Sequence, residues 1–194
     1  MNTVPYKTAA GCSWVPLESY LLSQRKVHLT GEITSQSADM FVQEMTYLAL
    51  NQPEEPVEIR VDSPGGEVTA GLLIYDTLKA LPMEYRIICT GTASSMAAII
   101  LAGGKKGCRF ILPHSKVMIH EPLIQGGVGG SATSIRKTAE SIMETKRLTA
   151  ELLSADTGKS IEEVEKAISF DNYMNAQEAV DFGIADKVIE SLFS

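Results

Sequence analysis

Between residues 57 and 102 a strand, a turn of small residues and a helix follow one another twice, and this pattern constrains the fold most. Val57, Ile59 and Val61 alternate with polar residues, as in a strand with one buried face, and Ser63-Pro64-Gly65-Gly66 ends that strand. Apolar residues at helical spacing then predict a helix over 67–81, closed by a proline. The segment therefore predicts a strand followed by a turn and a helix.

The second unit repeats this order. A strand at 86–89 leads into the small-residue turn 91–95 and a buried helix at 96–102, and two short strands follow at 108–112 and 116–119. Alternating strands and helices are typical of an α/β domain with right-handed connections. The sequence therefore predicts the α/β class.

Helices dominate the C-terminal part. An amphipathic helix is predicted from about residue 132 to 155, with Gly158 at its C-cap. Ser160 with Glu163, and Asn175 with Glu178, have the spacing of capping boxes that open two shorter helices.

Composition limits the kind of protein. The chain has 194 residues, 44% of them apolar, which suits one domain with a buried core. The net charge of −7 argues against nucleic acid or an anionic membrane as a partner. Three cysteines without metal spacing predict neither a disulfide framework nor a metal site. With no long apolar run and no leader pattern, we expect a soluble, cytoplasmic protein.

Ser95 stands where the second strand gives way to a helix, among small neighbours. A hydroxyl at such a turn is accessible, and the start of the helix offers unpaired N–H groups beside it. This setting suits a nucleophile whose reaction passes through an oxyanion. A serine that merely caps the helix fits the same pattern, and the turn alone favours that simpler interpretation.

Three other positions leave two interpretations open. His120 ends an apolar run and could act as a general base, although an isolated histidine is more often structural. Gly65 and Gly66 could bring an N–H close to a reacting carbonyl or could simply turn the chain. Asp171 is one of 24 acidic residues and matters only where it orients an imidazole.

Several motifs in a fixed order carry more information than any one of them. They are Ser63-Pro64-Gly65-Gly66, Thr69-Ala70-Gly71, Ile74-Tyr75-Asp76-Thr77, Gly91-x-Ala93-Ser94-Ser95-Met96, Leu112-Pro113-His114, Met118-Ile119-His120-x-Pro122-Leu123 and Glu178-Ala179-Val180-x-x-Gly183. In order and spacing this set resembles the ClpP family, the proteolytic subunits of the Clp protease, over nearly the whole chain. The resemblance reverses the preference at Ser95 and His120 in favour of catalysis.

The resemblance implies a serine endopeptidase with a Ser-His-Asp triad. Ser95 would attack the peptide carbonyl, His120 would take its proton, and Asp171 would orient the imidazole. The N–H groups of Gly66 and Met96 would face the developing oxyanion.

The implied fold is the ClpP/crotonase-like α/β superhelix of repeated ββα units with a protruding handle helix. We expect one peptidase domain over residues 1–194, with an axial N-terminal segment at about 1–20 and a handle region at about 124–156. A substrate strand would lie between Glu67-Val68 and the segment after Leu123, bound by main-chain addition.

The resemblance also implies an assembly. Heptameric rings would stack as a homo-oligomeric tetradecamer, with the option of a second ClpP-type subunit, and an AAA+ unfoldase of the Clp family would deliver unfolded polypeptides. ATP would be used by that unfoldase, so no cofactor or metal is expected in this chain.

The chain departs from the family pattern at surfaces of assembly. Ser169 and Phe170 replace an Asp-Arg pair that supports contact between rings. Glu58, Arg60 and Ala80 stand where aromatic residues usually help to form the pocket for an unfoldase loop. An apolar anchor would there meet charges that it has to desolvate.

Two further departures concern loops. The loop after Leu123 is longer than usual and has Ile124-Gln125 in place of two glycines. The basic N-terminal stretch of the family is missing, and Gly11-Cys12-Ser13-Trp14 stands nearby. The geometry of the substrate strand and of the axial loop therefore stays open.

Two alternatives follow. One is a structural or regulatory ring subunit that needs a second ClpP-type ring for activity and for docking of the unfoldase. The other is a crotonase-type acyl-CoA enzyme, since the folds are related, but such an enzyme has no need of Ser95 with His120 and Asp171.

Overall fold

The computed structural model describes residues 2–8, 11–124, 126–127 and 129–192. Parts of the predicted axial segment, at residues 1 and 9–10, and of the predicted handle region, at Gln125 and Val128, lie outside the described residues. The described part is a mixed α/β structure with a mostly parallel sheet, as the sequence predicts.

Seven strands form the main sheet: β3 (Lys26–Thr30), β4 (Val57–Ser63), β5 (Tyr85–Ser94), β6 (Arg109–Ile111), β7 (Lys116–Ile119), β8 (Asn172–Met174) and β9 (Lys187–Val188). The order is β3-β4-β5-β6-β9, all parallel, while β7 pairs in parallel with β5 and antiparallel with β8. The carboxyl ends of β5 and β7 therefore lie side by side, where the sequence places Ser95 and His120.

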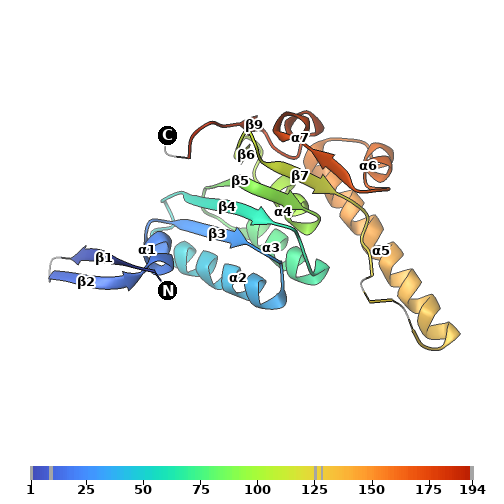
Figure 1. Cartoon of the computed structure of the whole chain (residues 1–194), viewed down its shortest axis with the longest axis horizontal. Helices are drawn as coiled ribbons and strands as arrows, with labels where there is room; N and C mark the ends of the chain where they lie inside the picture. Colours follow the sequence, from blue (N-terminus) through green and yellow to red (C-terminus); the bar gives the residue numbers. More distant parts are fainter. Residues whose placement is uncertain (1, 9–10, 125, 128, 193–194) are drawn as a thin grey trace.

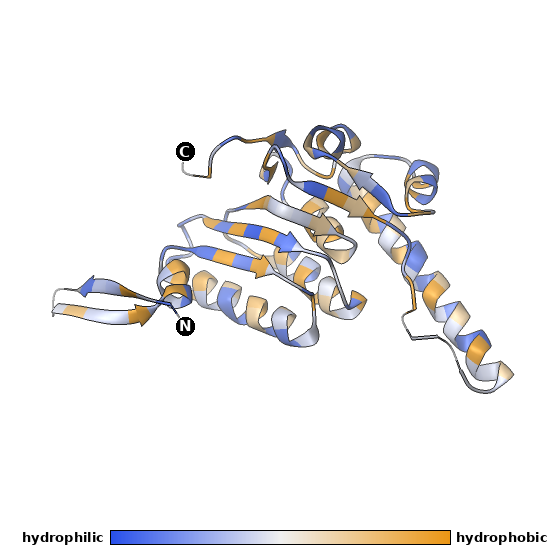
Figure 2. Ribbon diagram, viewed as in Figure 1, coloured by the Kyte–Doolittle hydropathy of each residue, from blue (hydrophilic) through white to orange (hydrophobic). Residues whose placement is uncertain are grey.

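Helices α2 (Ser35–Leu50), α3 (Val68–Ala80) and α4 (Met96–Ala102) pack against one face of this sheet (Figure 1). The strands turn their apolar residues to these helices, and orange and blue residues alternate along β4 in Figure 2. Every residue of α4 is buried, as predicted for a helix in the centre of the core.

The long predicted helix is α5 (Ala132–Thr157), which ends at Gly158 in a left-handed conformation with φ +80°. It projects well beyond the rest of the molecule in Figure 1, as a handle does. Both predicted capping boxes are present and open α6 (Ile161–Ala167) and α7 (Ala176–Phe182).

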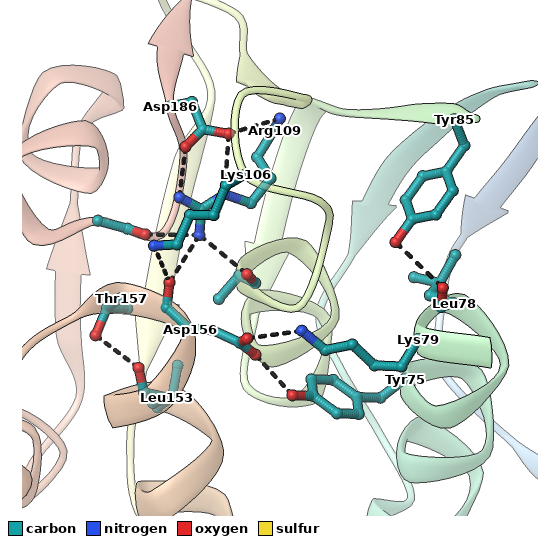
Figure 3. A network of polar contacts seen from close by, with 12 residues as sticks. Tyr75, Leu78, Lys79, Tyr85, Lys106, Arg109, Leu153, Asp156, Thr157 and Asp186 are labelled. Atoms are coloured by element: carbon teal, nitrogen blue, oxygen red, sulfur yellow. Dashed lines mark hydrogen bonds and ion pairs between the residues drawn. The ribbon is translucent and has the colours of Figure 1, made fainter. Parts of the chain in front are cut away.

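Figure 3 shows a polar network that fixes the C-terminal end of α5 to the sheet. The carboxylate of Asp156 accepts hydrogen bonds from Tyr75 (2.8 Å) and Lys79 (2.7 Å). Arg109, only 2% exposed, forms a fork with Asp186 and donates to the carbonyl oxygen of Asp156. Because a buried guanidinium is costly without partners, these bonds decide how the helix end is held.

The N-terminal elements were not predicted from the sequence. A two-stranded hairpin of β1 (Thr3–Thr8) and β2 (Gly11–Pro16) extends from the molecule, and α1 (Leu17–Ser23) connects it to β3. The hairpin lies within the expected axial segment, and Trp14 is 70% exposed on it.

Candidate active site

Ser95 lies in a strained turn between β5 and α4. Its backbone has φ 55° and ψ −124°, a conformation that non-glycine residues rarely adopt. A hydrogen bond from its N–H to the carbonyl oxygen of Met118 (2.8 Å) holds this turn against β7. Strain of this kind costs about 1–3 kcal/mol and collects at functional sites, as in the nucleophile turn of hydrolases.

The turn after β4 packs directly against this serine. A Cβ built on Gly65 would lie 2.7 Å from the Cβ of Ser95 and 3.2 Å from the nitrogen of Met96. No side chain fits there, and the φ of +91° also favours glycine. The segment Ser63-Pro64-Gly65-Gly66, which was predicted to end the strand, thus also packs against the serine turn through Gly65.

Two backbone N–H groups beside Ser95 have no acceptor among the described residues: those of Gly66 and Met96. Ile33 bonds to both neighbours of Gly66, since it donates to the oxygen of Gly65 and accepts from the nitrogen of Glu67, each at 2.8 Å. The N–H of Gly66 therefore points away from Ile33. Met96 is the first residue of α4, whose N–H has no partner within the helix.

His120 and Asp171 are brought together by the pairing of β7 with β8. Ile119 lies opposite Asn172, and the nitrogen of Glu121 donates to the oxygen of Ile168 (2.8 Å). The Nδ1 atom of His120 lies 3.5 Å from an oxygen of Asp171, just beyond a good hydrogen bond. The histidine side chain is 14% exposed and the aspartate 60%, so water reaches the carboxylate.

Ser95 and His120 follow neighbouring strands, because Ser94 pairs with Met118. Within the described residues, however, no hydrogen bond joins the Ser95 hydroxyl to the imidazole. Catalytic hydrogen bonds are often long before substrate binds. Among the described residues, the structure thus contains a histidine-aspartate pair, and a serine after the neighbouring strand that is not hydrogen-bonded to the histidine.

A groove of about 470 Å³ lies along the handle helix α5, lined on its other side by Val68 and by the segment that follows His120. Val68 and Leu123, two of the predicted substrate-binding residues, line it together with Ile124 and side chains of α5. Glu67 is the third predicted substrate-binding residue, and its carboxylate accepts hydrogen bonds from the nitrogen (3.2 Å) and hydroxyl (2.8 Å) of Ser35 at the start of α2.

An ion pair that the sequence did not predict joins the site to the handle. Lys146 of α5 lies 2.5 Å from the carboxylate of Glu121, which directly follows His120. Residue spacing gave no signal for it, because the partners are far apart in sequence. Glu121 is thus bonded through its backbone to the segment before Asp171 and through its side chain to α5.

The residues that depart from the family pattern differ in exposure: Phe170 is exposed, whereas Glu58 is buried. Phe170, in place of an ion-pairing residue, is 69% exposed, and Ser169 donates to the oxygen of Lys166 (2.8 Å). Glu58 was expected to put a charge on an open surface, and this was wrong. Glu58 is 7% exposed, because Arg60 and Arg86 cover it and bond to both of its oxygens.

Two absences concern the described residues only. They contain no group of three histidine, cysteine or acidic side chains placed to hold a metal ion. They also include no helix with the length and hydrophobicity to cross a membrane. The site described above is built from side chains and backbone N–H groups.

The sequence was also compared with models of protein families. The model described as Clp protease matches residues 9–192, nearly the whole chain. The match covers the serine turn, the histidine-aspartate pair, the groove and the handle.

Proposed function

The chain belongs to the Clp protease family, and from this we propose that it is the proteolytic subunit of an ATP-dependent Clp protease. It would hydrolyse peptide bonds of unfolded proteins inside a double-ring chamber fed by an AAA+ unfoldase. The observation that carries the proposal is the strained backbone of Ser95, which presents a hydroxyl beside two unbonded N–H groups. This is the arrangement that acyl transfer through an oxyanion requires.

In the proposed mechanism Ser95 Oγ attacks the carbonyl carbon of the scissile bond while His120 takes the hydroxyl proton. The negative charge on the carbonyl oxygen is met by the N–H groups of Gly66 and Met96. Asp171 stabilises the imidazolium from the far side of the ring. Collapse of the intermediate breaks the C–N bond, and His120 returns the proton to the leaving amine.

Hydrolysis of the acyl-enzyme completes the cycle. A water molecule gives a proton to His120 and its oxygen attacks the ester, and the serine then leaves with that proton. The missing bond between Ser95 and His120 forms, in this proposal, when a substrate strand enters the groove beside Val68 and Leu123. Binding then provides the alignment.

The proposed assembly is a pair of heptameric rings joined through the handles. Support comes from the length of α5 and from exposed apolar side chains, Ile135 and Met143 on α5 and Phe170 and Tyr173 at β8. Exposed apolar groups of this size are typical of protein interfaces.

Labelling with a fluorophosphonate probe tests the nucleophile. Wild-type protein should be labelled at Ser95, as located by peptide mass mapping, and Ser95→Ala should lose the label. Ser169→Ala, which removes an exposed hydroxyl near the site, serves as the matched control and should label as the wild type does. Equal labelling of Ser95→Ala and wild type would contradict the proposal.

A structural or regulatory ring subunit remains the second candidate, favoured by the exposed Phe170 in place of an ion-pairing residue. In that case the chain would co-purify with a second ClpP-type subunit and show no peptidase activity alone. Efficient cleavage by the homomeric protein with an added unfoldase would exclude it.

A further inference from the structure

The groove along α5 holds a single charge. Apolar side chains form much of its wall, with Val68 and Leu123 on one side and Ile142 of α5 on the other. Among the described residues that line it, Lys137 alone is charged, and no acidic residue is among them. A cation beside an apolar wall favours a ligand that combines an apolar part with an anionic group.

Lys137 differs from the other cations of α5 in having no acidic partner within the described part of the chain. The other three cations are each paired with a carboxylate: Arg136 with Glu140, Lys146 with Glu121 and Arg147 with Glu151. The chain as a whole carries −7, which repels acidic polypeptides. The ammonium group of Lys137 is therefore a local positive charge that a ligand in the groove can use.

Two serine hydroxyls extend the site on either side of Lys137. Ser134 lies three residues before the lysine and Ser141 four residues after it, so these three side chains neighbour one another on α5, and all three line the groove. In the described residues neither serine hydroxyl has a hydrogen-bond partner, whereas Thr138 and Thr145 donate theirs to backbone oxygens one turn earlier (3.1 Å and 3.0 Å). One ammonium and two hydroxyl donors form a set that suits a carboxylate.

The groove lies close along the chain to groups that the proposed mechanism uses at the scissile bond. Val68 follows Gly66 by two residues, and Leu123 follows His120 by three. A substrate strand bound by main-chain hydrogen bonds between these two segments turns every second side chain to the same face. A substrate residue within a few positions of the cleaved bond therefore places its side chain in the groove.

We propose that Lys137 determines specificity, by selecting substrate strands with a glutamate at the position whose side chain enters the groove. The methylene groups of the glutamate pack against Val68 and Ile142, while its carboxylate accepts hydrogen bonds from Lys137 and from the hydroxyls of Ser134 and Ser141. The inference rests on the proposed function, because the occupant is the substrate strand of the proposed peptidase.

Matched peptides test the preference. They are fluorogenic peptides of alanine that carry a single glutamate at each of the three residues before the cleaved bond in turn, and glutamine provides the uncharged match. At one of these positions we expect kcat/KM to be about three- to tenfold higher for glutamate than for glutamine. The ratio should fall toward one as the salt concentration rises, because salt screens an accessible ion pair.

Variants of the lysine identify the group that discriminates. Lys137→Gln should bring the ratio to about one, and Lys137→Arg should retain it, since the positive charge remains. Lys137→Glu should reverse the preference, in favour of a peptide with lysine in place of glutamate. Arg136→Gln is the matched control, because it removes the adjacent cation, which does not line the groove, and it should keep the wild-type ratio. Both positions are exposed on the helix, so the variants should fold.

A readout without cleavage separates this inference from the proposed function. Ser95→Ala leaves the peptides intact, and fluorescence anisotropy with dye-labelled peptides should show the same preference for glutamate, which adding Lys137→Gln should abolish. Equal binding and equal kcat/KM for the two peptides, or a wild-type ratio in Lys137→Gln, would overturn the inference even where the peptides are cleaved. Preferential binding of glutamate peptides that the wild type does not cleave would refute the peptidase and support the role of Lys137.

Discussion

Gly65 and Ser95 are in backbone contact: a Cβ on the glycine would lie 2.7 Å from the Cβ of the serine and 2.6 Å from the carbonyl oxygen of Ser94. The serine turn therefore has its shape only while residue 65 lacks a side chain. Gly65→Ala should lower the rate of fluorophosphonate labelling at least about tenfold and the free energy of unfolding by about 1–3 kcal/mol. Labelling kinetics and urea unfolding measure the two effects.

Gly107→Ala is the control for backbone strain alone. Gly107 also has a positive φ of +83°, but nothing lies within 4 Å of its built Cβ. We expect a loss of about 1 kcal/mol in stability and wild-type labelling. If Gly65→Ala labels as fast as Gly107→Ala, the contact with Gly65 does not shape the serine turn.

The histidine-aspartate pair predicts a moderate dependence on Asp171. A buried triad aspartate contributes about 10⁴-fold to kcat, but Asp171 is 60% exposed and 3.5 Å from the ring, so water shares its charge. Asp171→Asn should therefore lower kcat on a short fluorogenic peptide by only about 10–100-fold. Asp181→Asn, an exposed aspartate on α7, should leave kcat at the wild-type value. An unchanged kcat in Asp171→Asn would show that this aspartate does not serve the imidazole.

The ion pair between Lys146 and Glu121 predicts that the handle positions His120. Lys146→Met removes the link and should lower kcat about three- to tenfold, because the segment next to His120 gains freedom. Thermal stability should hardly change, since a partly exposed pair contributes about 0–1 kcal/mol.

The neighbouring residue provides the control. Arg147 pairs with Glu151 on the same helix, so Arg147→Met removes a charge without touching the site. Equal effects of the two variants on kcat would point to the charge of the handle and not to the link.

Elements whose sequence signals lie within a few neighbouring residues were the ones that could be predicted from the sequence. The helices at 96–102 and 132–157 were found because their apolar residues, Gly158 and the capping residues act within a few positions. The helix α2 also has apolar spacing, at Phe41, Met45 and Leu48, but its capping box uses Thr34 with Ser37 in place of an acidic residue. That weaker start signal was not recognised.

The features that could not be predicted correctly from the sequence depend on contacts between residues that are far apart along the chain. Glu58 was expected at an open surface because alternation along β4 shows the face but not what covers it, and Arg86 comes from another strand. The strand β8 has three residues, too few for a periodic pattern, yet it brings Asp171 to His120. The triad was predicted only through family resemblance, since isolated serines, histidines and aspartates are more often structural.

The network at the base of the handle predicts a large stability effect at Arg109. Its side chain is 2% exposed and donates to Asp186, to the carbonyl oxygen of Asp156 and to that of Gly183. Arg109→Met removes these hydrogen bonds and leaves the Asp186 carboxylate without its paired guanidinium, and it should lower the free energy of unfolding by about 3–5 kcal/mol. Lys106→Met, at the edge of the network, should cost about 1 kcal/mol or less. Similar losses in both variants, measured by urea unfolding, would show that burial at Arg109 is unimportant.

The Glu58 cluster predicts how acid weakens the protein. The pKa of Glu58 is lower in the folded state than its value of about 4.3 in the unfolded chain, so this carboxylate stabilises the fold above that pH. Its contribution is lost as the pH falls from about 4 through the folded pKa. Glu58→Gln should be less stable than wild type at pH 7, and the difference should shrink toward about pH 2. Glu54→Gln, at an exposed carboxylate, should run parallel to the wild type in urea unfolding at each pH. A constant difference between Glu58→Gln and wild type at every pH would mean that the two arginines do not act on a titrating carboxylate.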